Sequence, residues 1–172
     1  MGRLYCTRWN CAKWNWYGPV VSTSAESLDL DRQICFPLYA ATRAVTRKYA
    51  EVLADAGLTY PQYLVMLALW TDGPLTVGDL GRRLRLDSGT LTPLLKRLEA
   101  AGRVERRRDP HDERRVVVSP TAEGLRSRQE VAHVPHQVAG SIGLTADEFT
   151  QLQHLLGALI ENLDGVGVPE TP

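Results

Sequence analysis

The sequence predicts a mainly helical fold with one small β-hairpin, arranged as a winged helix-turn-helix. Three observations lead to this fold class. Apolar residues recur every three or four positions through most of the chain, two short capped helices follow each other across a tight turn, and two strands with a charged tip come directly after them. This order of elements is typical of the winged helix, in which the hairpin is the wing.

The first two expected helices cover 28–56 and about 61–70. Pro37 either kinks the first helix or lies in its first turn, where its missing N–H costs nothing, and Gly57 ends that helix. The second helix is apolar almost all round, which predicts that it is the buried helix of the core.

The helix-turn-helix and the wing are expected in the middle of the chain. Thr76 caps a short helix, and Asp87–Ser88 cap a longer one. The longer helix has an inward stripe of four leucines at helical spacing: Leu91, Leu94, Leu95 and Leu98. Strands over 104–108 and 114–118 then flank the charged tip of the wing.

Helices are expected again after the wing. Thr121 caps the first of them, because Pro120 bars an earlier start, and Pro135 interrupts it. The last helix opens with the capping box Thr145–Glu148. Its apolar stripe continues to Leu163, and a stripe of this length on a terminal helix needs a partner surface.

One domain is expected over 28–164, with the winged-helix core at 60–118. Residues 1–27 contain three tryptophans and two cysteines without any helical or strand period, so we expect a disordered or loosely packed extension there. Residues 165–172 are expected to be a flexible tail.

The charge of the chain is distributed unevenly. The formal net charge is +0, but eleven Lys and Arg residues stand against six Asp and Glu between Arg82 and Arg115. A basic block in a neutral chain is an electrostatic footprint for nucleic acid, although a solvated basic face has the same composition.

The predicted DNA-binding residues lie on the second helix of the pair and on the wing. Small polar residues near the start of that helix let the backbone approach a groove, and the cations reach phosphates, base edges or the adjacent minor groove. The residues are Ser88, Gly89, Thr90, Thr92, Lys96, Arg97, Arg106, Arg108, His111, Arg114 and Arg115.

The cysteines and the longest apolar run limit the other classes of protein. Three cysteines at irregular spacing, Cys6, Cys11 and Cys35, do not make a disulfide framework, and the run Tyr63–Trp70 is too short to span a bilayer. With no signal peptide recognised, the cytoplasm is the expected compartment. His133 and His136 could suggest a metal site, but Pro135 breaks their helical spacing, so we expect no metal. We expect no cofactor either.

Four segments, in order and spacing, resemble the MarR family of repressors. They are 33–39, 58–63, the pair 76–81 and 86–99, and 108–115. The first two resemble the OhrR branch, which senses organic hydroperoxides, and the resemblance covers about 28–163. It implies a regulator that is not an enzyme, an obligate homodimer formed through helices over 28–56 and 120–164, and a pseudo-palindromic DNA operator.

The resemblance also implies a sensor thiol. Cys35 matches the family's reactive cysteine, and Tyr39, Tyr49 and Tyr60 match tyrosines that donate hydrogen bonds to its thiolate. Tyr39 lies one helical turn from Cys35, whereas the other two are expected from the partner chain. No cysteine follows Cys35, which places the chain in the one-cysteine class that finishes with an external small thiol or by overoxidation.

Other readings of the same residues stay open at this point. The chain could be a MarR-type repressor released by a small aromatic ligand without thiol chemistry, a thiol peroxidase, or a protein-interaction module. Cys35 by itself has the composition of an inert core thiol beside leucines.

Overall fold

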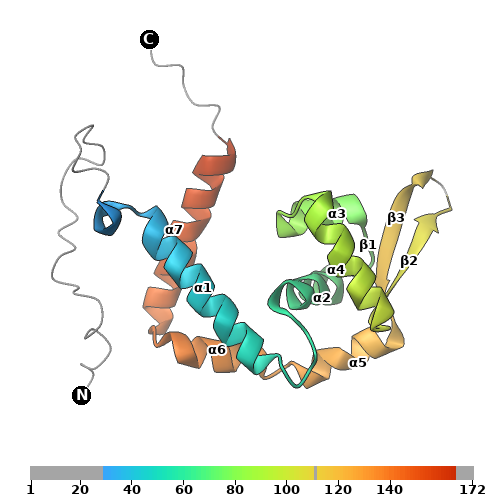
Figure 1. Ribbon diagram of the computed structural model, residues 1–172, viewed down its shortest axis with the longest axis horizontal. Helices are drawn as coiled ribbons and strands as arrows, with labels where there is room; N and C mark the ends of the chain where they lie inside the picture. Colours follow the sequence, from blue (N-terminus) through green and yellow to red (C-terminus); the bar gives the residue numbers. More distant parts are fainter. Residues whose placement is uncertain (1–28, 111, 166–172) are drawn as a thin grey trace, which may run out of the picture. The chain divides into compact units, whose positions relative to one another are not determined.

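The computed structural model describes residues 29–110 and 112–165, and it confirms the predicted fold class (Figure 1). A 3-10 turn, η3 (Leu30–Arg32), precedes the helix α1 (Cys35–Val52). The winged-helix part follows as α2 (Tyr60–Asp72), β1 (Leu75–Thr76), α3 (Val77–Leu84), α4 (Ser88–Ala100), β2 (Val104–Asp109) and β3 (Asp112–Pro120). The last three helices are α5 (Ala122–Glu130), α6 (Val134–Ile142) and α7 (Ala146–Gly165).

The chain divides between Arg47 and Lys48 into two units. The predicted extension at 1–27, the tail beyond residue 165, Cys6, Cys11 and His111 lie outside the described residues.

The first helix is shorter than the predicted range of 28–56. It begins at Cys35 with Pro37 in its first turn, where the Leu38 N–H donates to the Ile34 carbonyl at 3.4 Å. Proline has no N–H to donate, so it is tolerated there because the first turn has no intrahelical partners. The helix ends at Val52, ahead of a turn in which Gly57 has a φ of +62°.

Helix α2 is the buried helix of the core, as predicted. Its start is stabilised by a capping box, in which the Thr59 N–H donates to Gln62 Oε1 at 2.9 Å. Tyr63, Val65 and Met66 are almost completely buried. This helix contacts α3, α4, α5 and β3, so it lies at the centre of the winged-helix part and joins it to α5.

The helix-turn-helix forms as the sequence pattern indicates. Asp87 caps α4 by accepting the Thr90 N–H at 2.9 Å, and the predicted leucine stripe of α4 is buried, with Leu91, Leu95 and Leu98 in the same core cluster as Leu80 of α3. The turn between the helices places Arg85 in the left-handed region, at φ +55°. A non-glycine residue there costs about 1 kcal/mol, which packing of the two helices must offset.

The wing is part of a three-stranded antiparallel sheet with the order β1-β3-β2. Strand β2 is one residue longer than predicted, and β3 extends two residues beyond the predicted strand at each end. Strand β1 was not predicted, because two residues have no period of their own. Leu75 and Thr76 pair with Val118 and Val117, so this short strand ties the start of α3 to the wing.

The C-terminal helices start where their caps predict. Thr121 accepts the Gly124 N–H at 3.0 Å, and the Thr145 N–H donates to Glu148 at 2.8 Å. In the described part of the chain, none of the helices combines the length and the apolar character needed to cross a membrane.

Candidate functional site

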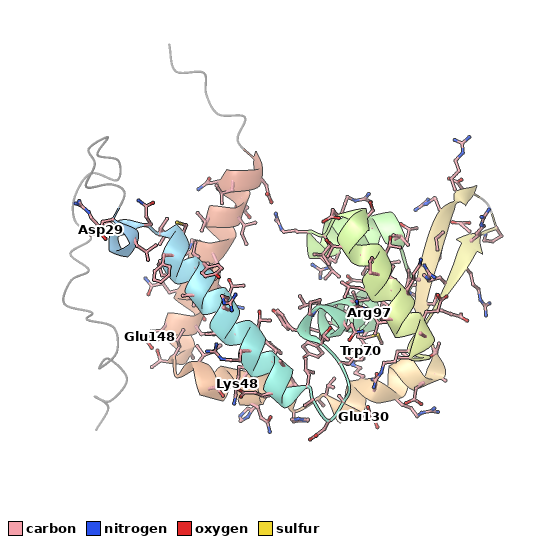
Figure 2. All side chains as sticks on the ribbon, viewed as in Figure 1. Asp29, Lys48, Trp70, Arg97, Glu130 and Glu148 are labelled. Atoms are coloured by element: carbon pink, nitrogen blue, oxygen red, sulfur yellow. The ribbon has the colours of Figure 1, made fainter. Side chains whose placement is uncertain are left out.

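The outer face of α4 carries six of the predicted DNA-binding residues. All six are exposed, on the side opposite the buried leucine stripe: Ser88, Gly89, Thr90, Thr92, Lys96 and Arg97. Figure 2 labels Arg97 on this helix. The Thr90 hydroxyl also donates to Asp87 at 2.8 Å, so this residue is both part of the cap and part of the surface. The face combines small polar groups at the helix start with cations further along it.

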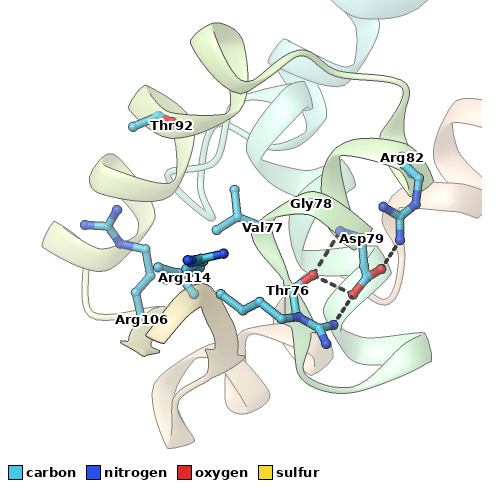
Figure 3. A pocket seen from close by; sticks show the side chains of 10 residues that line it. Thr76, Val77, Gly78, Asp79, Arg82, Thr92, Arg106 and Arg114 are labelled. Carbon is cyan, nitrogen blue, oxygen red and sulfur yellow. Dashed lines mark hydrogen bonds and ion pairs between the residues drawn. The ribbon is translucent and has the colours of Figure 1, made fainter. Parts of the chain in front are cut away.

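A hollow of about 590 Å³ lies beside α4, between the start of α3 and the wing (Figure 3). It brings together four predicted residues from different elements: Thr92 of α4, Arg106 of β2, and Arg114 and Arg115 of β3. Its other side is formed by Thr76, Val77, Gly78, Asp79 and Arg82. Three arginines from the wing therefore meet at one concave surface next to α4, the second helix of the helix-turn-helix, which we call the recognition helix.

Asp79 connects α3 to the wing at the edge of this hollow. Its carboxylate accepts the Thr76 hydroxyl at 2.5 Å, forms an ion pair with Arg82, and lies 3.6 Å from the Arg115 guanidinium. The hydrogen bond from Thr76 is the main reason why the pKa of Asp79 is lowered, and the two arginines lower it further. An ionised Asp79 thus orients Arg115. Sequence reasoning missed Asp79 and Arg82, although the spacing Thr76-x-x-Asp79 is a capping signal.

Arg106 lies against Glu99 at the end of α4. The Arg106 Nε donates to Glu99 Oε2 at 3.0 Å, and a second guanidinium nitrogen bonds the same oxygen. These bonds hold the pKa of the Glu99 carboxyl below its ordinary value. The pair fixes β2 to α4, so Arg106 joins the wing to the recognition helix as well as lining the hollow.

The other cations of this surface are less constrained. Among the described residues, no ion pair is recorded for Lys96, Arg97, Arg108 or Arg114. Arg107, which points to the opposite side of β2, is paired with Glu105 at 2.9 Å. The cations on the α4 side of the wing are therefore better placed to neutralise phosphate.

The thiol region belongs to the first unit. Cys35 is the first residue of α1 and is exposed, which agrees with the reading that places Pro37 in the first turn. One turn further along, Tyr39 is 59% exposed. The Arg43 guanidinium lies 5.6 Å from the centre of the Tyr39 ring and donates to its hydroxyl at 3.3 Å.

Tyr49 and Tyr60, the other two predicted tyrosines, meet in the second unit. Their rings stack with centroids 4.3 Å apart, and the ring of Tyr63 lies 5.7 Å from that of Tyr49. Burial raises the pKa of all three phenols, and the neighbouring phenol adds to the effect for Tyr49. They remain protonated hydrogen-bond donors near neutral pH. Sequence reasoning placed Tyr63 only in the core.

Comparison with known proteins agrees with this architecture. Residues 58–116 match the model of the MarR family. A transcriptional regulator named TtmR, from Methylorubrum extorquens, is 48% identical over 144 residues, covering 83% of this chain and 74% of the relative. The organic hydroperoxide resistance transcriptional regulator of Bacillus subtilis is 40% identical, covering 80% of this chain and 94% of its own.

A structure solved on DNA is similar in fold. Reduced AbfR bound to DNA superposes with a TM-score of 0.70 at 34% identity, covering 82% of this chain and 96% of that one. AbfR, from Staphylococcus epidermidis, is also known overoxidised on DNA and in a disulfide form.

Proposed function

The chain belongs to the MarR family of DNA-binding transcriptional regulators, and we propose that it is a repressor that senses organic hydroperoxides through Cys35. The observation that carries the proposal is the exposed Cys35 at the start of α1, one turn from Tyr39, in a chain 40% identical to a hydroperoxide resistance regulator. Its named relatives are transcriptional regulators rather than enzymes.

Operator binding in this proposal uses the exposed face of α4 and the wing. Regulators of this family bind DNA as dimers, and two copies of α4 read two half-sites about one helical turn apart. The exposed apolar side chains of α7, among them Phe149, Leu152 and Leu163, support a dimer formed through the terminal helices.

Sensing begins when the Cys35 thiolate attacks the distal oxygen of ROOH. An S–O bond forms, the O–O bond breaks, and the alkoxide leaves and takes a proton from solvent to become an alcohol. The product is a sulfenic acid, which condenses with a small thiol to a mixed disulfide and water. The hydroxyls of Tyr39, Tyr49 and Tyr60, the last two from the partner chain, stabilise the thiolate and lose that role when its charge is gone. The dimer then shifts and releases the operator.

The test is operator binding by gel shift, with DNA from upstream of the protein's own gene. Wild type and Cys35→Ser are compared with and without cumene hydroperoxide, and the intact mass of each protein reports oxidation. We expect peroxide to release wild type but not Cys35→Ser, which keeps the size of the side chain and removes the thiol. Equal binding of wild type before and after complete oxidation of Cys35 would exclude the thiol switch. A small aromatic acid that releases both proteins would favour a ligand-controlled repressor.

A further inference from the structure

We propose that Trp70 is a positioning residue that transmits the state of the Tyr49–Tyr60 pair to the base of the DNA-binding wing. The inference rests on the proposed function, because it needs a sensor that acts on those tyrosines. Its basis is an unbroken row of contacts within the second unit, from the tyrosine pair through α2 to α5 and the start of β2.

The row begins with aromatic rings. The aromatic residues of α2 lie on one face of the helix. Tyr63 and Trp70 come three and ten positions after Tyr60, and the helix has 3.6 residues per turn. Tyr63 is 2% exposed and lies 5.7 Å from Tyr49 and 6.4 Å, edge-on, from Trp70. A displacement of Tyr49 therefore meets a tightly packed ring that has no free space to move into.

The row continues by a hydrogen bond between elements far apart in the sequence. The Trp70 Nε1–H donates to the Gly124 carbonyl of α5 at 2.8 Å, 54 positions away. The same carbonyl accepts the Ser127 hydroxyl at 2.8 Å from within α5. Trp70 is thus the side chain of α2 that holds the first turn of α5 by a polar bond.

The first turn of α5 in turn holds the base of the wing. A Cβ on Gly124 would come 2.0 Å from the Arg103 carbonyl, and the Thr121 N–H donates to that carbonyl at 3.1 Å. The Arg103 guanidinium donates to the Ala56 carbonyl at 2.6 Å, in the turn between α1 and α2. Strand β2 starts at Val104, directly after Arg103, so a shift of α5 also moves the start of the wing.

Two variants separate this coupling from a general loss of stability. Trp70→Phe keeps an aromatic ring beside Tyr63 and removes the bond to Gly124 from α2. Ser127→Ala removes the other bond to the same oxygen, which lies within α5. Each change removes one side-chain hydrogen bond to that carbonyl, and each such bond is worth about 1 kcal/mol of stability.

The measured quantity is the ratio of operator Kd after and before complete oxidation of Cys35, with oxidation followed by intact mass. For wild type we expect a ratio in the usual range of coupling between sites, about 5- to 150-fold. Trp70→Phe should bind the operator normally when reduced and should oxidise at the wild-type rate, but its ratio should fall by about fivefold, the value of one hydrogen bond. Ser127→Ala should keep the wild-type ratio.

Other outcomes would overturn the inference. An unchanged ratio in Trp70→Phe, or equal falls in both variants, would show that the Trp70 bond only stabilises the fold. A wild-type protein that oxidises fully yet keeps its operator would refute the proposed function, and this inference with it.

Discussion

Replacing Gly124 with alanine tests the packing between α5 and the base of the wing. The new Cβ would lie 2.0 Å from the Arg103 carbonyl oxygen and 3.2 Å from Met66 Cε. Ordinary contact begins at 3.4 Å, so 1.4 Å must be opened against the backbone. The Met66 side chain can move, but the Arg103 carbonyl is held by the Thr121 N–H and by the start of β2.

The expected loss follows from these contacts. Overpacking in a well-packed site costs about 1–3 kcal/mol, and the upper end applies because the neighbour is backbone. The displaced helix also weakens the Trp70 and Thr121 bonds, at about 1 kcal/mol each, while alanine returns up to about 1 kcal/mol of helix propensity. The free energy of unfolding should therefore fall by about 3–4 kcal/mol, which lowers Tm by about 10 °C in a domain of this size.

Thermal unfolding by circular dichroism measures this change. Variants must be compared at one protein concentration, since the Tm of a dimer depends on it. Gly78→Ala in α3 is the matched control, because the nearest side-chain atoms that a Cβ built there would meet lie at 3.9 Å and Gly78 lies outside the helices proposed for the dimer, so its Tm should stay constant or rise slightly. If Gly124→Ala melts within about 1 °C of wild type, the close approach of α5 to Arg103 does not exist in the protein.

Two further predictions concern the charged surface. Arg108→Gln should make the plot of log Kd against log salt concentration shallower by about 2, because each of the two subunits releases one counterion fewer on binding the operator. Arg107→Gln, on the other side of β2, should leave this slope unchanged. Equal slopes for wild type and both variants would show that Arg108 is not at the interface. Glu99→Gln tests the pair with Arg106: a lowered pKa in the folded state means that the stability from this carboxylate is present above its ordinary pKa of 4.5 and is lost as the pH falls through the folded value. Chemical denaturation should thus find the variant less stable at neutral pH and closer to wild type in acid, and a pH-independent difference would contradict the pair.

The sequence predicted most of the local structure because the interactions that form it join residues close to one another along the chain. A cap joins residues three positions apart, as in Thr121 to Gly124 or Thr145 to Glu148, and a helical stripe repeats every three or four positions. Such interactions can be recognised without knowing the fold. Where the pattern was too short, as in the two residues of β1, the prediction missed the element.

The candidate site divides in the same way. Exposure of the α4 face follows from the leucine stripe on its other side, so the exposure of the residues proposed to bind DNA was predictable. The ion pair between Arg106 and Glu99 was not predictable, because it depends on how β2 lies against α4. The residue types predicted the positive charge on this surface, but the ion-pair partner of each arginine decides whether its charge is available to bind phosphate.

By itself the sequence determined the order of the elements, their caps and buried stripes, the basic block, and a cysteine followed one turn later by a tyrosine. Only the tertiary structure decided which distant groups meet: Asp79 with Arg115, Tyr49 with Tyr60, and Trp70 with Gly124. These contacts join segments that no local interaction connects. They exist because burial of α2 brings the segments together, and burial of a shared core is a property of the whole fold.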